Sequence, residues 1–585
     1  MRKTKILATL GPASSDVDTI KQMILKGMDA ARINFSHGTN ESRRAIIENL
    51  KKAREELGKP IALVLDTKGP EIRIKTFDTD KIYLEQGDRF TLTTRDIIGN
   101  KDIVAVTYDR LPNDLAVDSR VMIDDGLLEL KVSAIEETEI QCVAVNSGFL
   151  SNRKGINVPD IYVNLPSLTG QDIEDIKFGI EMGFDYVAAS FVRTANDVLN
   201  IRRLLENNGG RHMRIIAKIE NRDGVDNLDS ILELADSIMV ARGDLGVEIL
   251  PEEVPLVQKR MIHAGNLVGK PVVTASHMLE SMCKNPRPTR AEANDVANAI
   301  FDGSDVVMLS GETANGLYPA ESIAIMARIA LEAENYILAN ESGDRRKRRS
   351  VDRITTSALS FAACATAEDL QAACIVPITD SGFAARMVAK SRPKCPILAI
   401  TADEVVCRQL NLVWGCTPFL SENINGTAEV FAIAEEAAIK LGLATTGDPI
   451  VTLAGVPVGV AGTTNSLNVR TVGNVLVKGK GNNRGKVHGI ARPFKVQENR
   501  EHAYFEEGDI IICTVTNDEM MSFIKKAGAI VVGSWENVDI SHAETVAKAL
   551  EIPLLAADVK AVDFVRSGVP ITVDTDAGLM YNGYR

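Results

Sequence analysis

The feature that most constrains the fold is a regular alternation of short apolar segments with amphipathic helical segments. The apolar segments are rich in Ile, Val, Leu and Ala, which is typical of strands buried in a parallel sheet. The helical segments between them predict crossover helices. We expect eight such strands, near residues 4–9, 30–35, 61–66, 186–190, 215–219, 238–241, 271–274 and 305–309. Eight strand–helix units over roughly 250 residues fit an α/β fold of the TIM (β/α)8 barrel type.

The alternation of strands and helices is interrupted once and is followed by segments of different character, which predicts four domains. Between 72 and 166, short alternating runs with turn signals indicate a small all-β insert. A basic run at 345–349 is interpreted as a solvated linker, and a loop-like join is expected at 478–485. The expected division is 1–71 and 167–345 for the barrel, 72–166 for the β insert, 346–475 for an α/β regulatory domain and 476–585 for a C-terminal α/β module.

Composition excludes several classes of partner. The net charge is −13, from 66 basic and 79 acidic residues, which argues against a nucleic-acid or anionic-membrane partner. The eight cysteines are scattered without a C-x-x-C pair, which predicts a reduced, cytoplasmic chain without a disulfide framework or zinc site. No apolar run approaches the roughly 20 residues of a membrane helix.

Charged side chains follow two neighbouring strands of the predicted barrel. Lys218 and Glu220 are two residues apart at the end of one strand, so they face the same side. Asp244 follows the next strand, within Arg242-Gly243-Asp244. A surface salt-bridge cluster is the simpler explanation, but the recurrence of polar strand ends favours a site. Two carboxylates and an ammonium suit a divalent cation that bridges to an anionic, oxygen-rich substrate.

Other strand ends add oxygens and positive charge. The amide, hydroxyl, carboxylate and carbonyl oxygens of this region suit a large monovalent cation, and they belong to Asn34, Ser36, Asp66 and Thr67. Arg32, Arg73 and Lys218 supply charge for phosphate and carboxylate groups. Such a set fits phosphoryl transfer, which requires positioning and charge neutralisation. The sequence contains neither a P-loop nor the kinase H-R-D and D-F-G pair, so a nucleotide needs another kind of fold.

Seven segments together resemble the pyruvate kinase family, and the resemblance covers nearly the whole chain. They are residues 4–14, 31–38, 65–73, 218–221, 241–246, 285–292 and 309–314. The resemblance implies phosphate transfer from phosphoenolpyruvate to ADP, giving pyruvate and ATP, with Mg²⁺ (or Mn²⁺) and K⁺ as cofactors. It also implies that the β insert is a small β-barrel lid that closes over the nucleotide, and that the protein is a homotetramer.

The resemblance assigns roles residue by residue. Glu220 and Asp244 match the divalent-metal ligands, and Asn34, Ser36, Asp66 and Thr67 match the potassium cage. Arg32 and Lys218 match the phosphoryl contacts, with Lys218 also beside the forming enolate. Gly243 and Asp244 match the turn that receives the carboxylate. The positions that match nucleotide contacts are Asn34, Phe35, Ser36, His37, Arg73 and Lys154.

The chain departs from the family pattern in two places. Ser276 and His277 stand where the family commonly has Thr and Gln. The catalytic hydroxyl survives, but the lost methyl loosens its rotamer. The C-terminal module resembles the phosphohistidine domain of phosphoenolpyruvate-utilising enzymes around His542, yet residues 534–540 lack the glycines of that pattern. This loss argues against a phosphoryl-carrying role.

An effector site is expected in the regulatory domain. Thr379, Asp380, Ser381 and Gly382 follow a predicted strand and open a helix, and a glycine-rich turn occupies 459–464. Hydroxyls and backbone amides at such turns bind anions, which predicts a phosphorylated small-molecule effector. Because Asp380 is negative, a monophosphate is expected over a bisphosphate.

Two rival functions remain open at this point. A phosphoenolpyruvate or pyruvate lyase or aldolase on the same barrel shares the metal carboxylates but needs no potassium cage or nucleotide lid. A regulatory protein derived from a kinase is the non-enzyme alternative, and it predicts lost catalytic groups.

Overall fold

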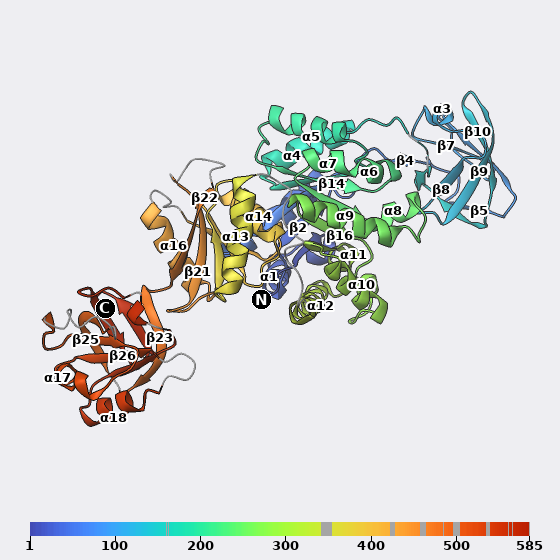
Figure 1. Ribbon diagram of the computed structural model, residues 1–585. Coiled ribbons are helices and arrows are strands. Elements are labelled where there is room, and N and C mark those ends of the chain that lie inside the picture. Colours follow the sequence, from blue (N-terminus) through green and yellow to red (C-terminus); the bar gives the residue numbers. More distant parts are fainter. Residues whose placement is uncertain are drawn as a thin grey trace. The chain divides into compact units, whose positions relative to one another are not determined.

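The computed structural model of the 585-residue chain is shown in Figure 1. It describes residues 1–159, 161, 163–340, 354–421, 427–456, 464–483, 485–494, 504–533, 539–559, 561–563 and 565–583. The chain divides into two compact units, Met1–Phe361 with Thr379–Glu422, and Ala362–Ile378 with Asn423–Arg585. The basic run at 345–349, most of the turn at 459–464 and residues 534–538 lie outside the described residues.

Eight parallel strands form a closed barrel in the first unit, in the order β1-β17-β16-β15-β14-β13-β3-β2. The expected α/β barrel is therefore confirmed, with each strand within one or two residues of its predicted position. The strands are β1 (Lys5–Leu10), β2 (Ala30–Asn34), β3 (Ala62–Asp66), β13 (Tyr186–Ala189), β14 (Arg214–Ile219), β15 (Ser237–Ala241), β16 (Val272–Ala275) and β17 (Val306–Leu309).

Helices surround the barrel and cover its outer face (Figure 1). They are α1 (Val17–Lys26), α2 (Asn40–Leu57), α4 (Gly170–Glu181), α5 (Ala195–Asn207), α6 (Arg222–Asp226), α7 (Leu228–Leu234), α8 (Arg242–Glu248), α9 (Val254–Val268), α10 (Arg290–Phe301), α11 (Gly311–Ala314) and α12 (Pro319–Asn340). Several begin with the capping pattern that satisfies their first backbone N–H groups, as Thr39 does for α2.

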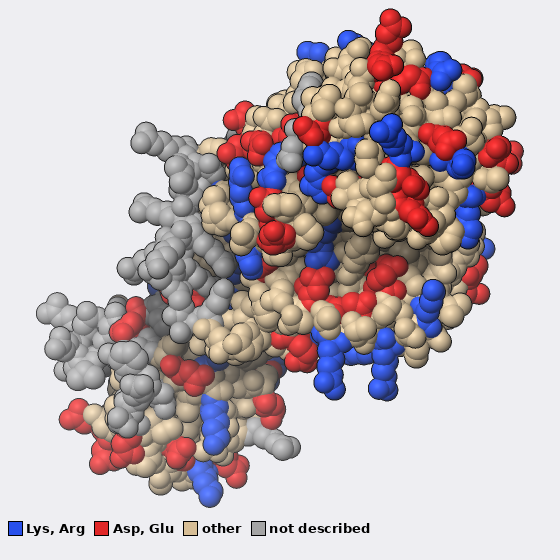
Figure 2. Space-filling model, turned by 90° about the vertical axis from the view of Figure 1, so that its right-hand side faces the viewer, with Lys and Arg blue, Asp and Glu red and all other residues tan. Residues whose placement is uncertain are grey.

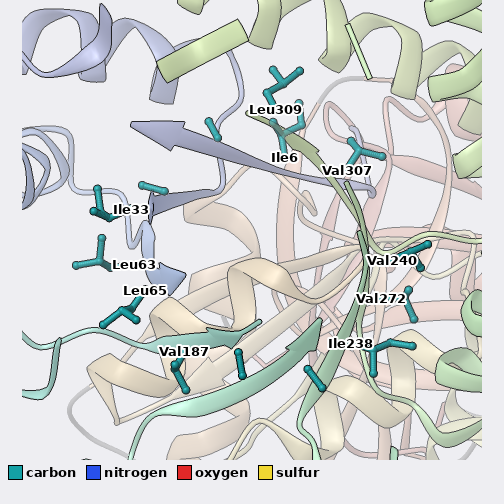
Figure 3. Packing of buried hydrophobic residues seen from close by; sticks show 14 of the residues in the cluster. Ile6, Ile33, Leu63, Leu65, Val187, Ile238, Val240, Val272, Val307 and Leu309 are labelled. Carbon is teal, nitrogen blue, oxygen red and sulfur yellow. The ribbon is translucent and has the colours of Figure 1, made fainter. Parts of the chain in front are cut away.

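The barrel strands are buried on both faces, which explains their continuous apolar sequences. Outward-facing residues such as Ile6, Ile33 and Val240 pack between strands and helices, as Figure 3 shows. Residues of the opposite parity, such as Leu7 and Ile216, belong to a separate cluster inside the barrel. The inside and the outside of the barrel therefore have separate cores.

A fourfold repeat of aspartates ties the amino ends of the strands together. One aspartate immediately precedes each of the second, fourth, sixth and eighth barrel strands: Asp29, Asp185, Asp236 and Asp305. Their carboxylates accept backbone N–H groups at the starts of the other four strands, at 2.8–2.9 Å, from Ile6, Leu63, Ile215 and Val272. Each also pairs with an arginine, respectively Arg2, Arg408, Arg202 and Arg392. The opposite, carboxyl ends of the strands are free of this arrangement.

The insert after β3 is composed of short strands apart from the single-turn helix α3 (Leu111–Asp114). A seven-stranded sheet has the order β4-β12-β8-β9-β10-β6-β7, and β11 pairs with β5. The strands are β4 (Ile72–Arg73), β5 (Lys81–Leu84), β6 (Arg89–Thr93), β7 (Ile103–Ala105), β8 (Arg120–Ile123), β9 (Leu128–Glu136), β10 (Glu139–Ala144), β11 (Gly148–Ser151) and β12 (Gly155–Asn157).

The α/β segment after the barrel contributes to both units. In the first unit, β19 (Ile397–Thr401) pairs in parallel with β20 (Cys416–Leu420), accompanied by α14 (Phe383–Lys390) and α15 (Glu404–Gln409). In the second, β18 (Cys374–Pro377) pairs with β21 (Pro449–Gly455), which pairs with β22 (Thr464–Thr471). Helices α13 (Thr355–Asp369) and α16 (Thr427–Lys440) complete the segment.

The C-terminal part of the second unit is a closed barrel in the order β23-β27-β26-β25-β24-β28-β29. Its elements are β23 (Val475–Asn482), β24 (Lys486–Phe494), β25 (Ile510–Cys513), α17 (Met521–Ile524), β26 (Ala529–Gly533), α18 (Ser541–Ala549), β27 (Leu554–Ala557), β28 (Pro570–Asp574) and β29 (Leu579–Asn582).

The prediction of a loop at 478–485 was wrong, because most of this segment is strand β23. Its glycines allow close backbone contact instead of a turn. A Cβ on Gly479 would lie 2.0 Å from the carbonyl oxygen of Ala556, and one on Gly481 would lie 1.8 Å from that of Thr575.

Candidate active site

A buried lysine connects three of the barrel strands at their carboxyl ends. Lys218, near the end of β14, is 9% exposed. Its Nζ lies 2.7 Å from Oγ of Ser190, 3.1 Å from Oδ1 of Asp66 and 2.9 Å from Oε1 of Glu220. Burial lowers the pKa of Lys218, but the charges of Asp66 and Glu220 more than offset burial, so its pKa lies above the ordinary value. The site therefore holds a fixed positive charge.

Arg32, from β2, approaches the same carboxylate from the other side. Its Nε donates to Oδ2 of Asp66 at 2.5 Å, and its Nη1 donates to Oγ1 of Thr9 at 2.9 Å. Burial raises the pKa of Asp66, but the positive charges of Arg32 and Lys218 outweigh burial and lower it. Asp66 is consequently a permanent anion that sets the spacing of the two cations.

Two carboxyl groups face each other beside this cluster. Glu220 is 1% exposed and accepts the backbone N–H of Phe191 at 2.6 Å. Asp244 lies in the first turn of α8. Burial raises the pKa of both groups, and the negative charge of Asp244 raises that of Glu220 further. A bound cation would stabilise the ionised form of these two buried carboxyl groups.

Two hollows adjoin the cluster. A cavity of about 870 Å³ is bounded by Pro12, Arg32, Asn34, His37 and Arg43, among others. A cleft of about 350 Å³ lies between the β insert and the barrel, and Glu71, Asp125, Asn157, Asp244 and Glu248 are among its lining residues. Nδ2 of Asn157 donates to Oε1 of Glu248 at 2.8 Å across this cleft. On the face drawn in Figure 2, acidic and basic side chains are interspersed rather than gathered by sign.

The family model described as pyruvate kinase, barrel domain matches residues 1–323, which is more than half of the chain. The chain belongs to the pyruvate kinase family. The pyruvate kinase alpha/beta domain matches residues 357–470, and the mobile domain of PEP-utilising enzymes matches residues 505–578.

Relatives within this family match the chain from end to end. Pyruvate kinases of Geobacillus stearothermophilus and Bacillus licheniformis are 46% and 45% identical to it, each over 100% of this chain and 99% of the relative. A crystal structure of a pyruvate kinase from Cryptosporidium parvum is similar with a TM-score of 0.76 and 37% identity, covering 80% of this chain and 96% of that one. The chain is a pyruvate kinase and hence a phosphotransferase.

The donor set at Glu220 and Asp244 fits a divalent metal. Magnesium in phosphate sites is held by one or two carboxylates, with substrate and water completing its oxygen ligands. The described residues contain no cluster of three or more His, Cys, Asp or Glu side chains of metal-binding geometry. Glu220 and Asp244 are two carboxylates whose pKa values are raised. They match this magnesium pattern, in which substrate and water supply the remaining oxygen ligands.

The four residues matched to the potassium cage of pyruvate kinase lie on neighbouring strand ends. Asn34 and Asp66 are register partners at the ends of β2 and β3. The backbone N–H of Ser36 donates to Oδ1 of Asn34 at 3.0 Å. Thr67 is 2% exposed and its Oγ1 accepts the backbone N–H of Ser190 at 3.1 Å. The structure thus brings the four residues into one region.

The residues matched to nucleotide contacts are spread more widely. His37 lines the cavity of about 870 Å³. The ring of Phe35 is buried against two core phenylalanines, and the guanidinium of Arg43 lies 4.4 Å from its centre. Arg73 and Lys154 lie in the β insert, where they pair with Glu71 at 2.7 Å and Asp124 at 2.8 Å, respectively.

Gly243 and Ser276 lie close to each other. A Cβ added to Gly243 would lie 3.4 Å from Oγ of Ser276 and 4.0 Å from Cε1 of His277. Both Ser276 and His277 have left-handed backbone conformations, with φ values of 72° and 52°. These residues follow β16, at the same end of the barrel as Lys218.

The residues proposed for effector binding lie at the other end of the barrel. The carbonyl oxygen of Ser381 accepts from Nη2 of Arg214 at 2.7 Å and from Nη1 of Arg386 at 3.2 Å. Arg214 is the first residue of β14, whereas Lys218 is near its last. The same strand therefore connects the segment that contains Thr379, Asp380, Ser381 and Gly382 with the lysine cluster.

Sequence reasoning missed Ser190 and Thr9. Ser190 receives a hydrogen bond from Lys218 and donates one to the carbonyl oxygen of Thr67 at 2.7 Å. Ser190 and Thr9 both stand at the carboxyl ends of strands, which is the position that identified the other site residues. The signal was present in the sequence, but neither residue carries a charge that draws attention to it.

Proposed function

We propose that this pyruvate kinase transfers the phosphoryl group of phosphoenolpyruvate to ADP at the cluster around Lys218. The observation that carries the proposal is the buried ammonium of Lys218, which three oxygens hold in place. A preorganised positive charge in a site shielded from water stabilises charge that develops in the transition state. Lys218 and Arg32 contact the transferring phosphoryl group, and Lys218 also neutralises the enolate oxygen.

The metal and substrate carboxylate complete this proposal. Mg²⁺ (or Mn²⁺), held by Glu220 and Asp244, neutralises phosphoryl oxygens when it is bound. K⁺ is held by the cage of Asn34, Ser36, Asp66 and Thr67. The turn of Gly243 and Asp244 receives the substrate carboxylate, and the Ser276 hydroxyl lies on the proton path to the enolate methylene.

ADP occupies the cavity of about 870 Å³ that Arg32, Asn34 and His37 line. Arg73 and Lys154 then approach the nucleotide from the β insert, which acts as a lid over it. Ser36 and the backbone of Phe35 complete the nucleotide contacts. The domain boundaries, with residues 72–166 as the lid, are part of this proposal.

The decisive experiment measures pyruvate formation from phosphoenolpyruvate with and without ADP. We expect strictly ADP-dependent turnover, and Lys218→Met should lower kcat by about 10³-fold or more while leaving the circular dichroism unchanged. Lys177→Met is the control, because Lys177 is half-exposed on α4 and pairs with Glu174. ADP-independent pyruvate release would support the lyase or aldolase alternative. Absence of turnover in the parent protein would support the regulatory alternative.

Regulation and assembly are proposed from the family resemblance. A phosphorylated metabolite, more specifically a monophosphate, binds at residues 379–382, and four chains assemble into a cytoplasmic homotetramer. No described helix is sufficiently long and apolar to cross a membrane.

The C-terminal module has a structural role in this proposal. The imidazole of His542 is engaged on both nitrogens, since Nδ1 lies 2.8 Å from Oγ1 of Thr516 and Nε2 lies 3.4 Å from Oδ1 of Asp518. Because the barrel already contains the groups for direct transfer, a relay histidine adds nothing to the reaction.

A further inference from the structure

The turn that carries Ser276 has an unusual backbone. Ser276 and His277 are consecutive, and their φ values of 72° and 52° are both left-handed. Residues with a Cβ atom avoid this region because of steric conflict, and two in succession are rarer still. Such a turn persists only where its surroundings hold it.

The guanidinium of Arg242 holds the turn. Its Nη2 donates to the carbonyl oxygen of Ser276 at 2.6 Å, and its Nε donates to that of Ala275 at 3.1 Å. Its Nη1 forms an ion pair with Oδ1 of Asp295, on α10, at 2.7 Å. Three donors in a rigid planar fork thus bind two successive carbonyl groups and one anchoring carboxylate.

Arg242 is adjacent in the chain to the turn proposed for the substrate carboxylate. Arg242 precedes Gly243 and Asp244 in the first turn of α8, so one residue joins that turn to the Ser276 turn. The spacing between Gly243 and Ser276, where an added Cβ would lie 3.4 Å from the Ser276 Oγ, is set by this connection. This spacing fixes where the serine hydroxyl lies relative to the turn of Gly243 and Asp244.

We propose that Arg242 is a positioning residue that fixes the left-handed turn and thereby the Ser276 hydroxyl opposite Gly243. This inference rests on the proposed role of Ser276 at the reacting end of the substrate. Lysine cannot replace Arg242, because an ammonium is a point charge without the fork that reaches two carbonyls and a carboxylate.

The first test is Arg242→Lys, with Arg260→Lys on the exposed face of α9 as the control. A displaced hydroxyl lowers kcat more than it raises the KM for phosphoenolpyruvate, and the expected fall in kcat is roughly 10-fold to 100-fold. The control should match the parent. A parent-like kcat in Arg242→Lys overturns the proposal.

The second test separates positioning from general stability. Glycine adopts the left-handed region freely and alanine does not, while both remove the imidazole of His277. With Arg242 present, His277→Gly and His277→Ala should have equal kcat values. In the Arg242→Lys background, the glycine variant should exceed the alanine variant by roughly fivefold.

An equal ratio of the two variants in both backgrounds contradicts the proposal. If Arg242→Lys does not fold, Asp295→Asn, which weakens the anchor of the guanidinium, takes its place in the same comparison. Failure of the proposed function has a different signature, because the parent protein itself then lacks ADP-dependent turnover.

Discussion

Adding a single methyl group at Gly243 should weaken the binding of phosphoenolpyruvate without lowering the stability of the protein. The backbone of Gly243 is not left-handed, so alanine fits its conformation. The added Cβ would lie 3.4 Å from Oγ and 3.5 Å from Cβ of Ser276, which is contact without overlap. Gly243→Ala therefore leaves the empty protein undisturbed, and its methyl group obstructs the approach of the substrate carboxylate to the turn of Gly243 and Asp244.

The two effects have opposite signs and separate magnitudes. Replacing glycine by alanine within a helix stabilises it by up to about 1 kcal/mol, and the first-turn position of Gly243 in α8 reduces this gain. The substrate carboxylate is charged, and the loss of one hydrogen bond to it costs about 1.5–3 kcal/mol. Since about 1.4 kcal/mol is tenfold, kcat/KM for phosphoenolpyruvate should fall roughly 10-fold to 150-fold.

Thermal unfolding and steady-state kinetics with phosphoenolpyruvate and ADP varied separately provide the assay. We expect an unchanged or higher Tm, a raised KM for phosphoenolpyruvate and an unchanged KM for ADP. Gly246→Ala is the control on the same helix, because its added Cβ meets only Val254 Cγ2 at 3.9 Å within 4 Å. A parent-like KM for phosphoenolpyruvate in Gly243→Ala would refute the placement of the carboxylate.

Three further outcomes are expected. Glu71→Lys should lower the potassium requirement, because the lysine ammonium would itself supply a positive charge at the site; equal activation of variant and parent by K⁺ in tetramethylammonium buffer would contradict this. Ser381→Glu should abolish activation by sugar phosphates and nucleoside monophosphates, measured as kcat/KM with each added effector, and unaltered activation would remove residues 379–382 from consideration. After incubation with labelled phosphoenolpyruvate, the protein should carry no acid-labile, base-stable label, and a label that disappears in His542→Ala would reverse the conclusion about the C-terminal module.

Sequence periodicity predicted the barrel because each strand is buried on both faces. Continuous apolar runs such as Ala62–Leu65 leave little alternative in an α/β chain, and the polar residues at their ends mark the edge proposed for the active site. Lys218, Glu220 and Asp66 could be named for this reason. They carry charges that a barrel core does not need.

Backbone geometry was beyond the reach of the same reasoning. The left-handed conformation of Ser276 and His277 depends on hydrogen bonds from Arg242, which is 34 residues away from Ser276. Glycines at 479 and 481 resembled turn signals, although they serve close packing of strands. Neither feature could be predicted, because sequence patterns report local preference, whereas distant partners decide these conformations.

The aspartates that precede alternate strands form their hydrogen bonds at the amino ends of the barrel strands, whereas the groups proposed for catalysis lie at the carboxyl ends. The two sets are separated by about one strand length. Asp236 holds the start of β14 through the backbone of Ile215, while Lys218 acts near the end of the same strand. Substitutions at one end can therefore change thermal tolerance while the reacting groups at the other end keep their spacing.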